Sequence, residues 1–206
     1  MDDVTRALQE ARRARPADEA RRSATRFATE AADTTDVAYA SLDSPVGSLL
    51  AVTSRRGLVA LLFVRGDEDT MLERIAHDVS PRILEAPSRL DAVRRELDEY
   101  FDGRRRDFDV GVDWALTQGF SRKVLQATHR IPYGSTSTYG AVADQAGSPR
   151  GFRAAGNALG SNPIPIVVPC HRVLPAGGGL GGYGGGPDKK EFLLRLEGAW
   201  DNGRLF

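Results

Sequence analysis

The stretch VAYASLDSPVGSLLAVTSRRGLVALLFV, residues 37–64, decides the fold of the first half of the chain. It contains three β-prone runs rich in valine and leucine. Ser-Pro-Val-Gly at residues 44–47 and Arg-Arg-Gly at residues 55–57 separate these runs, and both are turn signals. The pattern therefore predicts a three-stranded β-meander.

Two helical patterns follow the predicted meander. Residues 67–78 are compatible with a helix, and Ser88 precedes a second helix that ends at Gly103. The apolar residues of that second helix recur at helical spacing, at Leu90, Val93, Leu97 and Phe101. Residues 103–114 have no clear period and are typical of a linker. The sequence thus predicts an α/β domain over residues 37–113.

Residues 1–36 differ from the predicted meander in composition. They are rich in alanine, arginine and acidic residues, with Val4, Leu8 and Phe27 nearly alone as large apolar side chains. Such a segment is expected to be a solvated helical or disordered extension. It has no apolar core of a secretory signal, and no run in the chain approaches the ~20 apolar residues of a membrane span. With 206 residues, 41% of them hydrophobic and 27% charged, we expect a globular cytoplasmic protein without a membrane partner.

Residues 114–206 contain a second pattern of short helices. Residues 121–131 have helical spacing, and Thr138 is placed to cap a helix that stops at Gly147. Ser148 is expected to cap the next helix, which would contain Pro149 at its first position and end at Gly160. Two short helices joined by a tight corner predict a helix-turn-helix.

The second of these helices has two distinguishable sides. Three apolar residues are expected to face inward: Phe152, Ala155 and Leu159. Three polar residues are expected to face outward: Arg150, Arg153 and Asn157. Residues 117–206 carry ten Lys and Arg against five Asp and Glu, so this half of the chain is suited to a polyanion. The alternatives are an amphipathic helix on a protein surface and ordinary variation of surface charge.

The single cysteine, Cys170, excludes an internal disulfide and, with only three histidines in the chain, argues against a zinc site. Residues 163–169 contain three prolines, which exclude a helix before it. Catalysis by a thiol needs a lowered pKa, and the neighbouring His171 with Glu197 could supply a base and a carboxylate. The alternative is a buried cysteine without a role.

Glycine occupies eight of the ten positions at residues 177–186, a loop able to wrap closely around a flat ligand. The loop lacks the spacing of a dinucleotide site. The motif Pro-Cys-His-Arg-Val at residues 169–173 lies between Asn-Pro at residues 162–163 and this glycine loop with Tyr183. Together they resemble the active-site signature of the O6-alkylguanine-DNA alkyltransferase family, and the similarity extends over residues 37–200.

The resemblance implies a fold and a division of the chain. Residues 37–113 would form a ribonuclease-H-like α/β domain. Residues 114–206 would form a winged-helix-like helix-turn-helix domain that binds DNA and carries the active-site cysteine. Residues 1–36 have no counterpart in the family.

The resemblance also implies catalytic roles. Cys170 would accept the alkyl group, and His171 would form the thiolate through a bridging water. Glu197 would polarise His171, and Asn162 would hydrogen-bond within the active-site turn. On the DNA side, Tyr139 would rotate the phosphate of the target nucleotide and donate to guanine N3.

Further roles concern the helix and the base pocket. Arg153 would enter the base stack through the minor groove, beside the outward-facing Arg150 and Asn157. Four residues would form or support the base pocket: Val173 by its carbonyl, Tyr183 as a wall, Gly184 by its amide and Lys190 as a support of the loop. Many relatives have serine in place of Gly184, so a hydroxyl contact is lost here.

The implied function is repair of O6-alkylguanine, extending to O4-alkylthymine, by irreversible transfer to Cys170. Such a protein is consumed in one reaction and needs no cofactor or metal. Its expected partner is double-stranded DNA with alkylated bases, and the protein is expected to bind it as a monomer. Two alternatives remain. An alkyltransferase-like protein that only recognises damage would have the cysteine replaced, and a cysteine hydrolase fits adjacent Cys170 and His171 poorly.

Overall fold

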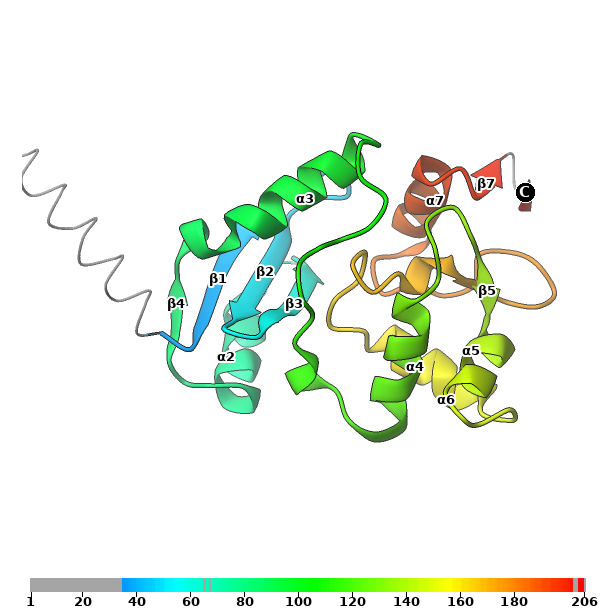
Figure 1. Ribbon diagram of the computed structural model, residues 1–206, viewed down its shortest axis with the longest axis horizontal. Helices are drawn as coiled ribbons and strands as arrows, with labels where there is room; N and C mark the ends of the chain where they lie inside the picture. The colour runs from blue at the N-terminus through cyan, green and yellow to red at the C-terminus, as the bar shows by residue number, and fades with distance from the viewer. Residues whose placement is uncertain (1–34, 65, 67, 202–203, 206) are drawn as a thin grey trace, which may run out of the picture. The chain divides into compact units, whose positions relative to one another are not determined.

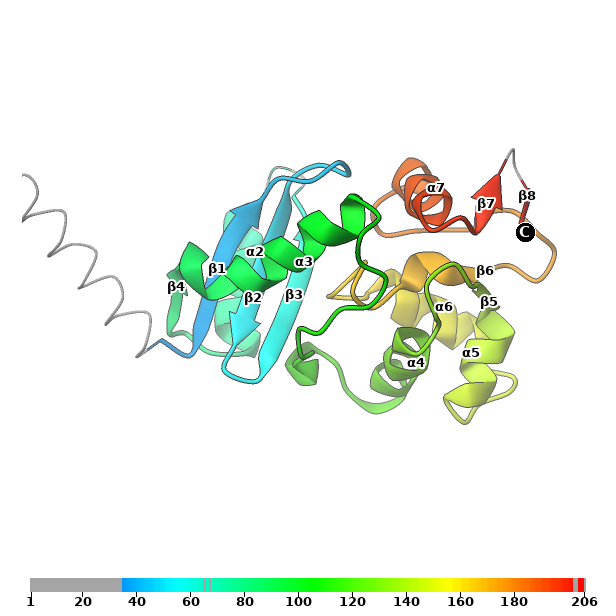
Figure 2. The same ribbon diagram turned by 45° about the horizontal axis from the view of Figure 1, so that its top comes forward.

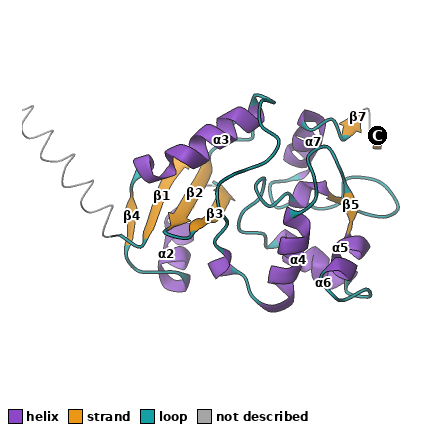
Figure 3. Cartoon of the chain, viewed as in Figure 1, coloured by secondary structure: helices purple, strands orange, loops and turns teal. Residues whose placement is uncertain are grey.

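The structure is a computed structural model that describes residues 35–64, 66, 68–201 and 204–205. The extension expected over residues 1–36 lies outside the described residues, apart from its last two. Strands and helices are combined in the first half of the described chain, and short helices dominate the second (Figures 1 and 3). Within these described ranges, no helix has the length and apolar character needed to span a lipid bilayer.

The sheet of the first half confirms the predicted meander. Strands β1 (Val37–Leu42), β2 (Leu49–Ser54) and β3 (Gly57–Phe63) pair in antiparallel fashion, with a register shift in β2. A short strand, β4 (Ile83–Glu85), adds to β1 in parallel and gives the order β3-β2-β1-β4. Strand β4 was not predicted from the sequence, because three residues are too few to show a period.

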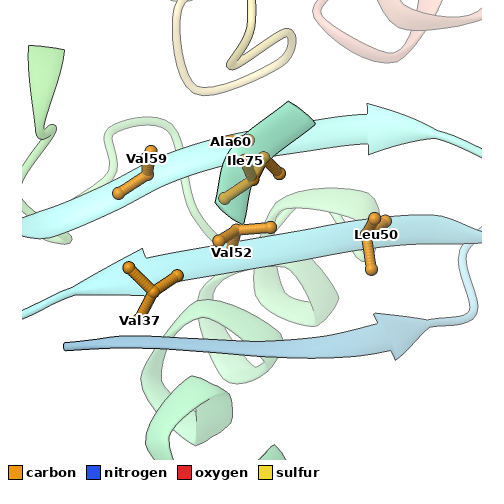
Figure 4. Close-up of a cluster of buried hydrophobic side chains, with 6 residues drawn as sticks. All are labelled: Val37, Leu50, Val52, Val59, Ala60 and Ile75. Carbon is orange, nitrogen blue, oxygen red and sulfur yellow. The ribbon is translucent and has the colours of Figure 1, made fainter. Parts of the chain in front are cut away.

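Two helices cover opposite faces of this sheet (Figures 1 and 2). Helix α2 (Glu68–Asp78) packs Ile75 onto one face, and helix α3 (Asp91–Phe101) follows a 3-10 turn at Pro87–Leu90. Figure 4 shows the cluster that includes the α2 contact, formed by Val37, Leu50, Val52, Val59, Ala60 and Ile75. The buried face of α3 uses Tyr100, which is fully buried, where we expected Phe101.

The β3 edge of the sheet is covered by segments from elsewhere in the chain. Its Leu58 N–H donates to the Gly111 carbonyl, and the Asp113 N–H returns a bond to the Leu58 carbonyl, both at 2.8 Å. The Leu61 N–H donates to the Pro163 carbonyl, also at 2.8 Å. An edge strand needs such partners for its backbone groups. The last of these bonds attaches the segment that precedes Cys170 to the sheet.

The second half consists of short helices and small sheets. The helices are α4 (Gly119–His129), α5 (Tyr139–Gln145), α6 (Phe152–Gly160) and α7 (Pro187–Leu196), with 3-10 turns at Trp114–Leu116 and Cys170–Arg172. Strands β5 (Ser137–Thr138) and β6 (Val173–Leu174) pair in parallel, and β7 (Trp200–Asp201) pairs with β8 (Arg204–Leu205) in antiparallel fashion. Helices α5 and α6 form the predicted helix-turn-helix.

The two caps that we predicted in this helix pair have different outcomes. Thr138 caps α5 as predicted, because its Oγ1 accepts from the Ala141 N–H at 3.1 Å. Ser148 does not cap α6, because the N-cap position is Gly151 and no side chain caps the helix. The Ser148 N–H donates to the Ala143 carbonyl at 2.9 Å and so closes the end of α5. Helix α6 therefore begins at Phe152, and the predicted start at Pro149 is wrong. The inward position predicted for Phe152 is also wrong, since the residue is 51% exposed.

Candidate active site and nucleic-acid-binding face

The backbone before the cysteine is bent sharply. Its three prolines prevent a regular helix, and the Val168 N–H closes a turn to the Ile164 carbonyl at 2.8 Å. Ile166 has a φ of 75°, a conformation that β-branched residues rarely adopt and that costs ~1–3 kcal/mol. Burial of Ile164 and Ile166 against the core offsets this cost. The bend delivers Cys170 to the start of a 3-10 turn.

Asn162 connects the two ends of this bend. Its Nδ2 donates to the Val168 carbonyl at 2.8 Å and to the Cys170 Sγ at 3.1 Å, while its Oδ1 accepts from the Ile164 N–H at 3.0 Å. The resemblance implied hydrogen bonds within the turn but not the bond to sulfur. Asn162 therefore both orients the turn and donates to the reactive atom.

A buried charge network lies behind the cysteine. The His171 Nε2 lies 2.9 Å from Glu197 Oε1, and the Arg172 guanidinium donates twice to the same carboxylate, at 2.8 Å each. The hydroxyl of Tyr100, on α3, donates to Glu197 Oε1 at 2.6 Å. All four side chains are buried, so low local dielectric strengthens these interactions.

The pKa values of this network assign its protons. Burial favours the neutral form of Glu197, but hydrogen bonds from His171 and Arg172 outweigh it and lower its pKa to about 2. The carboxylate is therefore ionised at neutral pH and can only accept, so the proton of neutral His171 lies on Nε2. Burial lowers the pKa of His171 despite Glu197. The Nδ1 of His171 is left with a lone pair and has no hydrogen-bond partner among the described residues.

The pKa of the thiol contradicts our expectation from the sequence. Burial raises the pKa of Cys170 to about 11, although the hydrogen bond from Asn162 and the charge of Lys190 each lower it. The predicted lowering of the pKa of Cys170 is therefore wrong for this structure. Sequence adjacency to His171 carries no information about how much water reaches the sulfur.

A cavity of about 360 Å³ opens onto the sulfur. It is lined by Tyr139 of α5, by Gly156, Leu159 and Gly160 of α6, by Cys170, and by Gly182, Tyr183 and Gly184 of the glycine loop. The volume is in the range of small-molecule sites. Three residues to which the resemblance assigned contacts with the base or the DNA therefore line the same cavity as Cys170: Tyr139, Tyr183 and Gly184.

The glycine loop approaches its neighbours closely. A Cβ at Gly185 would lie 2.7 Å from Cε1 of Tyr183 and 2.8 Å from Cε2 of Phe63, so only glycine fits there. Lys190 of α7 supports the loop from below, with its Nζ 2.7 Å from the Val173 carbonyl and 3.4 Å from the Gly182 carbonyl. Burial lowers the pKa of Lys190 to about 8.

Val173 and Lys190 do not line the cavity with Cys170. The Val173 carbonyl, which the resemblance assigned to the guanine amine, already accepts from Lys190 and retains only its second lone pair.

The outward face of α6 lies apart from the cavity. Arg153 and Asn157 are exposed there, as predicted, and Arg150 is exposed in the turn before the helix. The Arg153 guanidinium carbon lies 5.6 Å from the centroid of the Phe152 ring. Side chains toward the interior of the helix pair, Ala155 and Leu159, are buried. The helix thus separates an exposed basic face from the residues that border the sulfur.

Two residues of the charge network were missed in the sequence. Tyr100 follows Val93 and Leu97 at helical spacing, a signal that marks it as buried but not as a partner of Glu197. Arg172 lies inside the active-site motif, where its charge gave no indication of burial. The described residues contain no group of three or more His, Cys, Asp or Glu placed to hold a metal ion.

Comparison with known proteins adds two family matches. Residues 37–114 match the profile "6-O-methylguanine DNA methyltransferase, ribonuclease-like domain", and residues 119–199 match the profile "6-O-methylguanine DNA methyltransferase, DNA binding domain". These matches confirm the fold class that the sequence predicted. Our domain limits, residues 37–113 and 114–206, stay a prediction.

Similar whole proteins carry one name. The methylated-DNA–protein-cysteine methyltransferase of Methanosarcina acetivorans is 40% identical over 161 residues, which is 78% of this chain and 98% of the relative. The protein of that name from Mycobacterium tuberculosis H37Rv is 40% identical over 159 residues, which is 77% of this chain and 91% of the relative.

Solved structures agree with these matches. The crystal structure of Mycobacterium tuberculosis O6-methylguanine methyltransferase has a TM-score of 0.68 at 36% identity, over 82% of this chain and 96% of that chain. A complex of the Mycobacterium tuberculosis protein OGT with DNA has a TM-score of 0.66 at 38% identity, over 78% of this chain and 92% of that chain. With two family domains matched and relatives aligned over nearly their full length, this chain belongs to the 6-O-methylguanine-DNA methyltransferase family.

Proposed function

We propose that this chain repairs DNA by transferring an alkyl group from O6-alkylguanine, and from O4-alkylthymine, to the sulfur of Cys170. One observation carries the proposal: the sulfur borders a base-sized cavity, and a neutral histidine held by a buried carboxylate follows it in the chain. The names of the similar proteins support the same reaction.

The catalytic roles follow from the proton assignment. The His171 Nδ1, with its lone pair, takes the proton of the Cys170 thiol through a bridging water. The negative Glu197 stabilises the imidazolium that forms, as carboxylates do in nucleophile–base–acid relays. Asn162 donates to the sulfur and so stabilises the developing thiolate.

The transfer is a single displacement. The sulfur forms a bond to the alkyl carbon, and the bond from that carbon to O6 breaks with its electron pair left on guanine. Guanine takes up one proton, which balances the proton that the thiol has lost. The product is a thioether, which water does not hydrolyse, so each protein molecule reacts once. The raised pKa of Cys170 keeps the resting thiol protonated and slow toward other electrophiles.

Reaching the cavity requires that the damaged nucleotide leave the base stack, because a buried sulfur cannot attack a base inside a duplex. Arg153 on the exposed face of α6 would fill the space left by the base, while Arg150 and Asn157 bind the backbone nearby. Tyr139 would contact the rotated phosphate and donate to guanine N3. Tyr183 and the Gly184 amide would enclose the base, and O6 would accept from that amide.

The partner that we propose is double-stranded DNA with alkylated bases. The match of residues 119–199 to a DNA-binding domain supports this choice, as does the excess of basic residues in the second half of the chain. We further propose that one copy of the chain acts alone on each lesion and that it does so in the cytoplasm. Analytical ultracentrifugation of the free protein and of its complex with a short damaged duplex tests the first of these statements.

Intact-mass measurement tests the reaction. After incubation with a duplex that contains O6-methylguanine, the protein should gain one methyl group in place of one hydrogen, on Cys170, with no turnover. Cys170→Ala should bind the same duplex without a change in mass. If the wild-type protein binds damaged DNA but never gains mass, the protein is a damage-recognition protein and the proposed reaction is wrong.

A further inference from the structure

Two large apolar side chains are exposed in the described part of the chain, and they differ in their surroundings. Phe192 of α7 is 39% exposed, and its ring packs against Phe101 with the centroids 6.5 Å apart. Phe152 is 51% exposed, and the described residues include no second ring against it. Within the part of the chain that the structure describes, its ring interacts with the Arg153 guanidinium. Water contact with half of a phenylalanine is costly unless a partner covers it.

The position of Phe152 identifies the kind of partner. It is the first residue of α6 and lies in sequence between two exposed arginines, Arg150 and Arg153. A basic surface of this kind favours a polyanion over a second copy of the same chain, because two copies would bring like charges together. One exposed ring also contributes far less than the ~1,200 Å² that a stable protein interface buries.

Helix α6 links this ring to the reaction site. Further along the same helix, Gly156, Leu159 and Gly160 line the cavity with Cys170. At a rise of ~1.5 Å per residue, the helix places residue 152 about 6 Å before Gly156 and about 10 Å before Leu159 along its axis. The ring therefore lies within about three base-pair steps of ~3.4 Å of the residues that line the cavity.

Resting on the proposed function, we propose that Phe152 is a second wedge that packs its ring into the minor groove, against the nucleotide next to the extruded one. Arg153 then occupies the space of the extruded base itself, and the two side chains act as one unit. Proteins that bend DNA through the minor groove commonly insert apolar side chains between base steps in this way. A phenyl ring also has a flat face for stacking on a base that has lost its neighbour.

Single-turnover rates provide the test. With a duplex containing O6-methylguanine, Phe152→Ala should lower the second-order rate constant of methyl transfer about tenfold, a typical effect of removing one stacking ring. Free O6-benzylguanine needs no extrusion from DNA, so Phe152→Ala should react with it at the wild-type rate. Phe152→Leu should retain most of the duplex rate, because it keeps an apolar wedge. Phe192→Ala is the matched control and should match the wild type on both substrates.

Two further readouts separate the wedge from a simple phosphate contact. The salt dependence of duplex binding should be unchanged in Phe152→Ala, whereas Arg150→Ala should reduce its slope by ~1. The fluorescence of a 2-aminopurine placed beside the lesion should increase when the wild-type protein binds. The increase should be smaller with Phe152→Ala.

Three results would overturn the wedge. These are a wild-type duplex rate for Phe152→Ala, an equal loss on the free base, and a changed salt slope. Loss of duplex binding cooperativity alone, at an unchanged rate, would assign Phe152 to contact between copies instead. Failure of the wild-type protein to accept a methyl group from either substrate would overturn the proposed function, which is a distinct outcome.

Discussion

The two halves of this molecule stabilise their interiors by different means. The sheet half buries valine, leucine and isoleucine in a purely apolar cluster between β-strands and α2 (Figure 4). Its buried carboxylates, Glu96 and Asp113, lie outside that cluster. The half that carries Cys170 also buries apolar residues, but it encloses His171, Arg172, Lys190 and Glu197 as well. Burying such groups is unfavourable unless they pair with one another. We infer that the four charged groups gathered around Glu197 and Cys170 serve the proposed chemistry.

Besides the bond from Leu61 to the Pro163 carbonyl, a side-chain hydrogen bond joins the sheet half to the charge network of the site. The hydroxyl of Tyr100, at the end of α3, is the sheet half's contribution to the Glu197 carboxylate. If the two halves differ as described, substitutions in the charge network should be sensitive to pH, and substitutions in the sheet core should not.

The largest expected effect is that of Arg172→Met. It removes two hydrogen bonds from a buried carboxylate and leaves the charge of Glu197 undercompensated, which should cost ~3–5 kcal/mol of the free energy of unfolding. The pKa of Glu197 in the wild type is about 2, below its ordinary value, so its stabilisation is present above pH ~4.5 and is lost as the pH falls toward 2.

Urea unfolding followed between pH 7 and pH 3 measures this effect. The free energy of unfolding of Arg172→Met should be lower than that of the wild type at pH 7. It should also fall less steeply than that of the wild type as the pH is lowered. The double variant Arg172→Met/Glu197→Gln should regain part of the loss because no unpaired buried charge remains. Equal stability of Arg172→Met and the wild type at pH 7 would contradict the account of the network.

The next effect is that of Leu50→Ala in the centre of the sheet. Leu50 is fully buried, and its removal should cost ~2–5 kcal/mol through lost burial and a residual cavity. The loss should be the same at pH 5 and at pH 8, because the cluster around it contains only apolar side chains. A loss that varied with pH across that range would show that the two halves are not distinct in the way proposed.

Tyr100→Phe tests the contact between the halves. Losing a hydrogen bond to a charged group should cost ~1.5–3 kcal/mol of stability. The pKa of Glu197 should rise without this donor, so the acid limb of the rate of methyl transfer should move to higher pH. Tyr133→Phe is the matched control, since its hydroxyl donates to the Leu196 carbonyl and not to the carboxylate. A pH profile unchanged in Tyr100→Phe would limit this residue to packing.

Local signals in the sequence predicted much of the fold. The meander over residues 37–64 and the Thr138 cap depend on neighbouring residues, so pattern and structure agree. The start of α6 failed because two local signals compete at Gly147, Ser148 and Pro149. The serine is a good cap by residue type and its N–H closes the previous helix, but the next helix has Gly151 at its N-cap, three residues beyond the predicted cap.

The site was predictable where it lies within a motif and not where it depends on distant parts of the chain. Cys170, His171 and Asn162 belong to one segment, so their proximity follows from the sequence. Tyr100 is 97 residues from its partner Glu197, and no pattern near either residue indicates the contact. The predicted lowering of the pKa of Cys170 was wrong for the same reason, because several segments of the chain together bury the sulfur.

The smallest expected effect concerns the bond from Asn162 to the sulfur. Asn162 lowers the pKa of Cys170 from the higher value that burial alone would produce, so Asn162→Ala should raise that pKa further above about 11. At fixed pH below the pKa, the thiolate fraction falls in proportion, and the rate of reaction with iodoacetamide at pH 8 should drop about threefold, or ~0.7 kcal/mol. In every variant the rate of reaction with iodoacetamide should keep rising as the pH is raised to 10.

Asn162→Asp separates the electrostatic effect from a change in the turn. It keeps an acceptor for the Ile164 N–H but places a negative charge beside the sulfur, so its thiol should react more slowly than that of Asn162→Ala. Ser161→Ala is the control, because its hydroxyl bonds only to carbonyls of α6. If Asn162→Asp reacted as fast as the wild type, the amide would act only by shaping the backbone, and the sulfur would owe its reactivity to the histidine alone.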